Sequence, residues 1–280
     1  MNLSNKIGLG TVQFGMAYGI SNESGQTAEF EVKRILNTAS KYNIKFIDTA
    51  SAYGNAETVL GDNDLNGFKV ISKYMPPSES NDINEQFIDS TEKLKIGSLY
   101  GYLAHRPLDL LKNKEQWSQL NKLKQEGKVE KIGYSLNQPT ELEQLLDNEM
   151  FPDLIQVPFN YFDDRFKALM IKLKERGCEI HTRSTFLQGL FFMDPDKLSS
   201  HFESVKVILN ELQTSFTANL SGALMKYVLS LDYVDAVIMG VENEMQLIEN
   251  LEKISDAKEM TPITSPINEN ILMPSMWPKM

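Results

Sequence analysis

The sequence predicts a closed barrel of eight parallel strands that alternate with helices, the α/β class known as the (β/α)8 or TIM barrel, in a single domain over residues 1–280. The chain has 280 residues, close to the ~250 that one such barrel needs. Short apolar or β-branched runs alternate with segments of helical periodicity along its whole length. No linker, low-complexity tract or shift in composition divides it, so one domain is expected.

The predicted strands are eight short runs, and the gaps between them carry helical patterns. After the first strand, for example, Phe30, Ile35, Leu36 and Ala39 follow a 3.6-residue period. The gap at residues 183–235 is the longest, and we expect it to hold an extended loop and more than one helix. The strands are expected at residues 6–9, 45–48, 69–72, 99–103, 131–134, 154–157, 178–182 and 236–239.

Three ionisable residues lie at or just past the carboxyl ends of three successive strands. Asp48 ends the second run, Lys73 follows the third, and His105 follows the fourth. In barrels of this class the carboxyl-end face carries the chemistry, whereas charges at the opposite ends usually serve stability. Tyr53 lies in the loop that follows Asp48. The four side chains are therefore expected to meet at the chemically active face.

These four residue types together can deliver a proton to a carbonyl oxygen. A tyrosine hydroxyl holds its proton at neutral pH, and a nearby ammonium stabilises the phenolate that remains once the proton is given up. Lys73 is the candidate ammonium, and Asp48 would keep it charged and in place. His105 could donate a hydrogen bond to the same carbonyl oxygen. None of these groups carries two electrons, so a bound cofactor has to supply the hydride.

The sequence resembles the aldo-keto reductases, and the resemblance is collinear over nearly the whole chain. It implies NADPH- or NADH-dependent reduction of an aldehyde or ketone, with Asp48, Tyr53, Lys73 and His105 as the catalytic residues. The motifs that carry it are Gly8-Leu9-Gly10-Thr11, Phe46 to Glu57, Ser72-Lys73, Ala104-His105-Arg106-Pro107, Lys131 to Ser135, Ile155 to Asn160, Arg183-Ser184 and Gln246 to Asn250.

The resemblance also implies a cofactor site along the strand-to-helix loops. The helix expected at residues 244–250 would offer its N-terminal amides to phosphate. The implied contacts are Ser135 and Gln156 for the nicotinamide carboxamide, Ser184, Leu187 and Gln188 for the pyrophosphate, Glu249 and Asn250 for the adenine, and Thr11 with Gln13 in the first loop.

Two positions depart from the family pattern near the nicotinamide. Leu136 stands where an asparagine often follows the serine that matches Ser135. Arg183 stands where a tyrosine often stacks on the nicotinamide ring. A planar guanidinium can also stack on a ring, so the second change is compatible with binding.

A further departure concerns the choice of cofactor. Most members of the family grip the 2′-phosphate of NADPH with a basic residue after the last strand and an arginine four residues before the final asparagine. Gly240 and Gln246 occupy these positions here. No lysine or arginine occurs from 239 to 250, and Glu242 and Glu244 add negative charge. We expect NADH to be accepted comparably or better, unless a cation such as Arg183 or Lys253 folds over the site.

The glycines near the start of the chain do not form a dinucleotide-binding fingerprint. Gly15 comes too late after Gly8 and Gly10, and the next helix is expected only around Thr27. The first strand also begins almost at once, so the β-hairpin that often closes the barrel floor in the family is expected to be short or missing.

Composition narrows the possible partners and compartment. The net charge of −10, from 28 basic and 38 acidic residues, argues against a nucleic-acid partner. No window approaches the ~20 apolar residues of a membrane span, and no export signal begins the sequence. The single Cys178 excludes an intrachain disulfide, suits a reducing compartment, and is expected to be a buried packing residue. We expect a cytoplasmic monomer or small homo-oligomer.

No metal site is expected, because the sequence has no Cys/His cluster of ligand spacing. His181 and His201 are therefore interpreted as structural or exposed residues. The substrate is expected to be a small-molecule carbonyl, with a sugar-derived one as the first candidate. Aromatic walls for its pocket could come from the loops and the C-terminal tail, that is from Phe14, Tyr18, Phe159, Tyr161, Phe186 and Trp277.

Two other functions stay open. A redox-sensing or regulatory barrel would bind the cofactor with little turnover, because a fold does not guarantee activity. A barrel lyase would use Lys73 as a Schiff-base nucleophile, which needs a neutral amine. Asp48 counts against the lyase, because a paired carboxylate keeps the ammonium charged.

Overall fold

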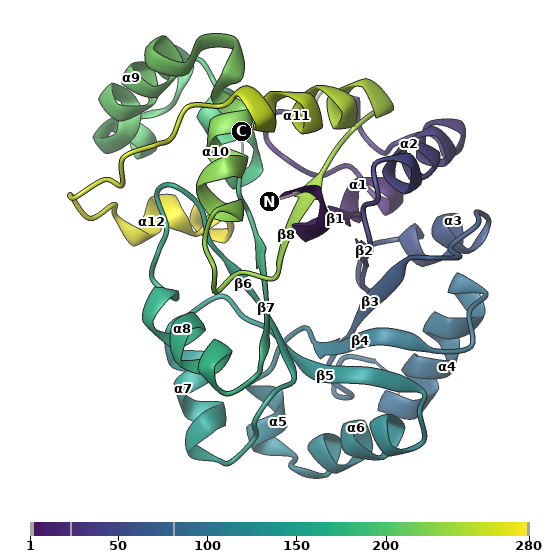
Figure 1. The fold of residues 1–280 in the computed structure, drawn as a ribbon. Coiled ribbons are helices and arrows are strands. Elements are labelled where there is room, and N and C mark those ends of the chain that lie inside the picture. Colours follow the sequence, from purple (N-terminus) through teal and green to yellow (C-terminus); the bar gives the residue numbers. More distant parts are fainter. Residues whose placement is uncertain (1–2, 23, 81, 279–280) are drawn as a thin grey trace.

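The protein is a closed barrel of eight parallel strands, paired in chain order with β1 also joined to β8. The structure is a computed structural model that describes residues 3–22, 24–80 and 82–278. Figure 1 shows the strands at the centre with helices around them. All eight predicted strands are confirmed, as β1 Ile7–Gly10, β2 Phe46–Asp48, β3 Lys69–Tyr74, β4 Leu99–Ala104, β5 Val129–Ser135, β6 Leu154–Pro158, β7 Glu179–Arg183 and β8 Ala236–Gly240.

The helices cover the outside of the barrel with one apolar face each. In α2, for example, Val32, Ile35, Leu36 and Ala39 are buried, as their spacing predicts. The α-helices of the described residues are α1 Val12–Gly15, α2 Glu29–Lys41, α3 Ala56–Gly61, α4 Ile83–Leu94, α5 Asp109–Lys112, α6 Glu115–Gln125, α7 Pro139–Asp147, α8 Lys167–Glu175, α9 Lys206–Phe216, α10 Leu220–Leu229, α11 Glu244–Asp256 and α12 Glu269–Leu272.

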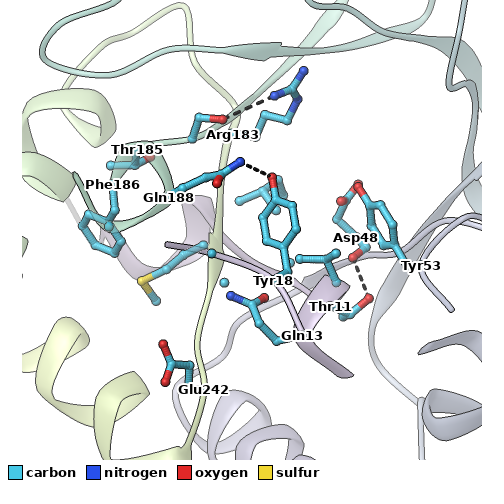
Figure 2. Close-up of a pocket in the computed structure, with 18 of the residues that line it drawn as sticks. Thr11, Gln13, Tyr18, Asp48, Tyr53, Arg183, Thr185, Phe186, Gln188 and Glu242 are labelled. Atoms are coloured by element: carbon cyan, nitrogen blue, oxygen red, sulfur yellow. Dashed lines mark hydrogen bonds between the residues drawn. The ribbon is translucent and has the colours of Figure 1, made fainter. Parts of the chain in front are cut away.

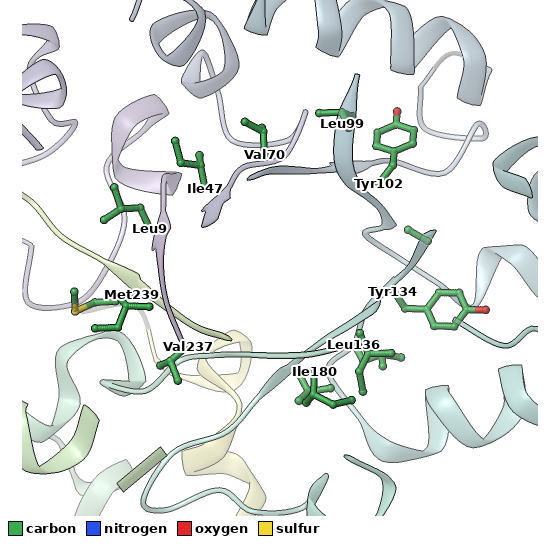
Figure 3. Packing of buried hydrophobic residues seen from close by; sticks show 14 of the residues in the cluster. Leu9, Ile47, Val70, Leu99, Tyr102, Tyr134, Leu136, Ile180, Val237 and Met239 are labelled. Atoms are coloured by element: carbon green, nitrogen blue, oxygen red, sulfur yellow. The ribbon is translucent and has the colours of Figure 1, made fainter. Parts of the chain in front are cut away.

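Side chains on opposite faces of the strands enter different apolar layers, because successive residues of a strand alternate in direction. One layer, the main core, lies between the strands and the helices. Figure 3 shows Leu9, Ile47 and Val237 of the main core pointing outward from the ring of strands. An inner cluster consists of strand residues such as Phe46 and Ile71. At the carboxyl ends of the strands, polar side chains such as Asp48 face the inside of the barrel.

The segment between β7 and β8 builds a second apolar cluster, separate from the main core. It contains the short helices η2 Leu187–Phe192, η3 Pro195–Lys197 and η4 Ser200–Val205 as well as α9 and α10, which confirms the expected extended loop and several helices. The C-terminal segment, yellow in Figure 1, runs from α11 past α9 to α12 and joins this cluster. The ring of Trp277 lies edge-on against Phe202, with 5.1 Å between the ring centroids.

The floor of the barrel, at the amino ends of the strands, is held by a polar cluster around Glu179. Its carboxylate accepts hydrogen bonds from the Tyr100 hydroxyl at 2.6 Å and from His181 Nε2 at 2.7 Å, and Lys131 Nζ lies 3.3 Å away. Burial by itself raises the pKa of Glu179, but these bonds outweigh it and bring the pKa down to about 2. His181 is completely buried, so its interpretation as a structural residue is confirmed.

No hairpin precedes the barrel among residues 3–6, where the short helix η1 Leu3–Lys6 leads directly into β1. Lys6 Nζ donates to the carbonyl oxygen of Leu231 at 2.9 Å, which ties this helix to the turn before β8. The expectation of a short or missing hairpin therefore holds for the described residues.

Candidate active site

A cavity of about 390 Å³ opens at the carboxyl ends of the strands. Its wall comes from the segments that follow β1, β2, β4, β5, β7 and β8, and Figure 2 shows the labelled side chains around it. The volume lies within the ~300–1,000 Å³ of small-molecule sites. Eleven of the predicted catalytic and cofactor-contact residues line it, namely Thr11, Gln13, Asp48, Tyr53, His105, Ser135, Arg183, Ser184, Gln188, Gly240 and Gln246.

Lys73 lies directly beneath the cavity and joins two of its lining residues. Its Nζ atom is 2.6 Å from Asp48 Oδ2, 2.9 Å from the carbonyl oxygen of Thr49 and 3.2 Å from the Tyr53 hydroxyl. An ammonium has three protons, so all of them have partners here. The Lys73 side chain is completely buried. The sequence prediction that Asp48, Tyr53 and Lys73 meet is therefore confirmed as geometry.

The charge of Lys73 follows from these contacts. Burial alone lowers the pKa of a lysine, but Asp48 and Tyr53 more than offset this and raise the pKa of Lys73 above its ordinary value. Lys73 is therefore an ammonium at neutral pH. A Schiff-base nucleophile requires the neutral amine, so this environment argues against the lyase.

Asp48 is held from both sides of its carboxylate. Oδ2 binds Lys73, and Oδ1 accepts a hydrogen bond of 2.6 Å from Gln156 Nε2. Thr11 binds the backbone of the same residue, donating from Oγ1 to the Asp48 carbonyl oxygen at 2.9 Å. Gln156 is completely buried behind Asp48 and is not among the residues that line the cavity, and its Oε1 atom has no hydrogen-bond partner among the described residues.

Close contact between two loops fixes the position of Tyr53. A Cβ atom on Gly15 would lie 1.7 Å from the Tyr53 carbonyl oxygen, and one on Gly54 would lie 2.2 Å from the Gly15 carbonyl oxygen. Gly54 also has a φ of +57°, a conformation that favours glycine. Both glycines are needed for the loops after β1 and β2 to touch. Gly15 is thus a packing residue, in agreement with the rejection of a phosphate-binding fingerprint.

The first helix begins earlier than expected. The single turn α1 follows β1 directly and is closed by a hydrogen bond from Met16 N to the Val12 carbonyl oxygen. The expectation that no helix opens before about Thr27 is therefore wrong. Phe14, in the middle of this turn, is fully buried in the main core, and this burial stabilises a turn that is too short to persist alone.

His105 stands beside Tyr53, with 5.8 Å between the ring centroids and an edge-on arrangement. Burial, helped by the charges of Lys73, Arg183 and Arg106, lowers the pKa of His105 to about 3. The imidazole is therefore neutral at physiological pH and can donate one N–H bond. Its buried Nδ1 atom has no hydrogen-bond partner within the described part of the chain.

Arg183 connects the loops that follow β5 and β7. One of its guanidinium nitrogens donates to the Leu136 carbonyl oxygen at 2.9 Å and to Asn137 Oδ1 at 2.7 Å. Leu136 points into the main core, and Asn137, one residue further, lines the cavity. Asn137 was not among the predicted site residues, although it is a polar residue just past a strand end. Its place two residues past the end of β5 is the sequence feature that would have predicted Asn137 as a site residue.

The loop after β7 adopts an unusual backbone path. Ser184, Leu187 and Gln188 have φ angles of +65°, +46° and +52°, which are rare for residues other than glycine. Leu187 is buried in the second cluster and does not line the cavity, whereas its neighbours Ser184 and Gln188 do. Thr185 also lines the cavity and was missed, and its buried Oγ1 has no partner among the described residues.

Two loops meet over one side of the cavity. Gln188 Nε2 donates to the Tyr18 hydroxyl at 3.0 Å, and the Ile20 amide donates to the Gln188 carbonyl oxygen at 3.2 Å. A Cβ atom on Gly189 would lie 2.1 Å from Ser21 Oγ. The segment 18–21 is thus bound closely to the loop after β7, as the dashed bond in Figure 2 indicates.

The opposite end of the cavity reaches the start of α11. Gly240, Glu242 and Gln246 line it there. The side chain of Asn243 accepts a hydrogen bond of 2.8 Å from the Gln246 amide, and the Gln246 side chain accepts one of 2.7 Å from the Glu242 amide. The helix N-terminus is therefore capped by its own residues.

Charged residues near this end are largely paired. Arg34 of α2 lies 2.7 Å from the Glu244 carboxylate, and Thr38 donates to the same carboxylate at 2.6 Å. Lys253 lies 3.4 Å from Glu249 on the surface of α11. Glu249 and Asn250 are not among the residues that line the cavity. The cations nearest to this end therefore already have carboxylate partners.

Aromatic residues line the cavity differently from the expectation. Tyr18 and Phe186 do line the cavity. Phe192 also lines it and was not among the predicted residues. The expectation is wrong for the other four aromatic residues, because packing takes them elsewhere. Phe14 and Phe159 are in the main core, and Tyr161 and Trp277 pack against the second cluster.

The unpartnered atoms around the cavity indicate a polar ligand. His105 Nδ1, Thr185 Oγ1 and Gln13 Oε1 are buried without a hydrogen-bond partner in the residues described. A nicotinamide cofactor offers donors and acceptors of the required kind, so the residues present fit it. Within residues 3–22, 24–80 and 82–278, no group of three or more His, Cys, Asp or Glu side chains could hold a metal ion. No described helix is long and apolar enough to span a bilayer.

The closed barrel brings Asp48, Lys73 and Tyr53 together at its carboxyl-end face, where TIM-barrel enzymes carry their chemistry. The sequence model of the aldo/keto reductase family matches residues 6–265. The chain belongs to this family, which confirms the resemblance and supports carbonyl reduction in general.

Individual relatives agree with this assignment. The chain is 32% identical over 174 residues to the glyoxal reductase of Bacillus subtilis, which covers 60% of this chain and 61% of the relative. It thus spans about three fifths of that protein. Among solved structures, the aldo-keto reductase AKR11C1 of Bacillus halodurans superposes with a TM-score of 0.71 at 20% identity, over 91% of this chain and 88% of that one. The glycerol dehydrogenase AKR11B4 of Gluconobacter oxydans gives a TM-score of 0.70 at 18% identity, over 94% of both chains. These structures share the fold.

Proposed function

We propose that the protein reduces an aldehyde or ketone to an alcohol, with NADH or NADPH as the hydride donor and Tyr53 as the proton donor. The observation that carries the proposal is the 3.2 Å contact between Lys73 Nζ and the Tyr53 hydroxyl, at the base of a cavity that Tyr53 lines. A charged lysine at this distance favours the phenolate that Tyr53 becomes when it gives up its proton.

Each of the four residues has a separate task in this proposal. The reduced nicotinamide, when bound, supplies the hydride to the carbonyl carbon. Tyr53 gives its proton to the carbonyl oxygen, so the product is a neutral alcohol. Lys73 stabilises the resulting phenolate, and Asp48 holds Lys73 in place at 2.6 Å. His105, as a neutral imidazole, donates a hydrogen bond that orients the carbonyl.

The cofactor is proposed to lie along the cavity from Tyr53 to the start of α11. Ser135, Arg183, Ser184 and Gln188 would hold it at the catalytic end, and Thr11, Gly240 and Gln246 towards the other end. Gln156 positions Asp48 through Nε2 and is retained as a proposed contact of the nicotinamide carboxamide through its unpartnered Oε1, and Leu187 is proposed as an anchor of its loop. Glu249 and Asn250, one turn further along α11, are retained as the proposed adenine contacts.

The substrate is proposed to be a small oxygenated carbonyl. The B. subtilis relative is named a glyoxal reductase, so glyoxal and related dicarbonyls come first, followed by sugar-derived aldehydes and ketones. The test is the loss of reduced-cofactor absorbance with each substrate, using purified protein and both NADH and NADPH. A protein that binds cofactor but turns over none of these carbonyls would support the regulatory barrel instead.

The lyase is tested separately. Borohydride is added to the protein together with each substrate, and the mass of the chain is measured. A covalent adduct on Lys73 would support a Schiff base and contradict the reductase. Unmodified protein is expected, because the ion pair with Asp48 keeps Lys73 charged.

A cytoplasmic location is also proposed. It is supported by the lone Cys178, whose buried side chain packs in the main core and whose pKa burial raises to about 12. Such a thiol is a packing residue with little thiolate and does not need an oxidising compartment. Fractionation of cells that produce the full chain, followed by detection with an antibody, would test the location.

A further inference from the structure

Arg183 brings a positive charge to the cavity wall, and no carboxylate among the described residues forms an ion pair with it. Its three hydrogen bonds go to the Leu136 carbonyl oxygen, to Asn137 Oδ1 and, at 3.3 Å, to Ser184 Oγ. All three acceptors are neutral. Within the described ranges, none of the ion pairs includes Arg183. The guanidinium is thus held in place while its charge stays uncompensated.

This charge lies at the catalytic end of the cavity. Burial is the largest cause of the lowered pKa of His105, the charge of Lys73 is the next, and the charge of Arg183 follows. Arg183 also lowers the pKa of Tyr18, against the larger effect of burial, which raises it. Of the described carboxylates that line the cavity, Asp48 is already paired with Lys73, and Glu242 lies beyond Gly240 at the opposite end. The region around Tyr53 and His105 therefore carries a net positive charge from Arg183.

We propose that Arg183 makes the cavity bind the reduced nicotinamide more tightly than the oxidised one. The inference rests on the proposed function, because hydride transfer requires the reacting ring to lie next to a carbonyl held by Tyr53 and His105. That ring is neutral in the reduced cofactor and carries one positive charge in the oxidised cofactor. The adenosine and diphosphate parts are the same in both, so the difference in affinity reports the surroundings of the ring.

The expected size of the effect follows from the charges. Two like charges several ångströms apart in a partly buried site repel strongly enough to change affinity about tenfold. For a two-electron couple, a tenfold difference corresponds to a reduction potential of the bound cofactor that is higher by about 30 mV. The charge of Arg183 would therefore weaken the binding of the oxidised cofactor and would disfavour the positive charge that the ring gains in hydride transfer.

The experiment compares the dissociation constants of NADH and NAD+ for the full chain, by fluorescence titration and calorimetry at fixed ionic strength. In the wild type, NADH is expected to bind about tenfold more tightly than NAD+. In Arg183→Gln, which removes the charge but keeps hydrogen-bonding groups, the ratio should fall towards one through tighter NAD+ binding. Arg183→Lys is the matched control that keeps the charge, and its ratio should stay near the wild-type value.

The proposal and the proposed function fail in different ways. Equal affinities for the two forms in the wild type, or an unchanged ratio in Arg183→Gln, would overturn the role of Arg183 while leaving the reductase intact. A wild type that binds neither form would overturn both. If Arg183→Gln does not fold by circular dichroism, Asn137→Ala and Arg183→Lys still provide a test. Both keep the charge, so both must keep a clear preference for NADH.

Discussion

At the scale of single residues, the proposed chemistry depends on the Tyr53 hydroxyl. Tyr53→Phe removes one oxygen and leaves the cluster of Lys73 and Asp48 in place. General acid catalysis is typically worth ~10²–10⁴ in rate, so kcat for a good carbonyl substrate should fall by that factor while the cofactor dissociation constant barely changes. The measurement is steady-state kinetics together with a titration of each cofactor. Wild-type kcat in Tyr53→Phe, with chemistry limiting the rate, would show that another group donates the proton.

The neutral state of His105 leads to a second residue-scale prediction. A histidine with its ordinary pKa of 6.5 would change charge in the middle of the physiological range, but burial lowers the pKa of His105 to about 3. Its imidazole should therefore stay uncharged between about pH 5 and 8. The pH profile of kcat/KM for His105→Gln should be lower than that of the wild type but have the same shape. A wild-type inflection near the ordinary histidine value that disappears in His105→Gln would contradict this.

At the scale of an element, the start of α11 bears on the choice between NADPH and NADH. Gly240 and Gln246 cannot neutralise a 2′-phosphate, and Glu242 brings an acidic residue to the same end of the cavity. NADH is therefore expected to bind comparably to NADPH or better. Gln246→Arg should strengthen NADPH binding about tenfold through a charge-assisted contact and leave NADH unchanged. The matched control is Gln246→Leu, which adds no charge.

Fluorescence titration of each reduced cofactor decides this prediction. Wild-type binding of NADPH about a hundredfold more tightly than NADH, equivalent to about 2.7 kcal/mol, would contradict it. Such a result would require a cation free to reach the phosphate. Arg34 is one candidate, because its partner Glu244 begins α11, and it would have to leave Glu244.

At the scale of the whole molecule, the polar cluster at the barrel floor ties stability to pH. The folded-state pKa of Glu179 is lowered from 4.5 to about 2, so the ionised form stabilises the fold. This contribution is fully present above about pH 4.5 and is lost as the pH falls towards about 2. Glu179→Gln should lower the unfolding free energy at neutral pH by ~1–3 kcal/mol and flatten the acid side of the stability profile. Urea unfolding at several pH values measures both effects.

Much of this architecture could be predicted from the sequence because it depends on local patterns. Short apolar runs set the strands, and in a parallel barrel the residues just past strand ends must meet, which brought Asp48, Lys73 and His105 together. Residues placed by tertiary packing were not predictable in this way. Trp277 joins a second apolar cluster, and Gln156 turns towards Asp48, because their neighbours come from distant parts of the chain.

The hydrogen bond between Tyr18 and Gln188 bears on how long a bound molecule stays. Both residues line the cavity, on two loops that are joined there (Figure 2), so an elongated ligand beneath them leaves when the loops separate. Removing one hydrogen bond of ~1 kcal/mol should shorten the residence time of the cofactor about fivefold. Stopped-flow dissociation of NADH from Tyr18→Phe measures this, and an unchanged off-rate would mean that the loops part elsewhere. If the off-rate rises as expected, the rate of turnover depends on the separation of these two loops as well as on hydride transfer.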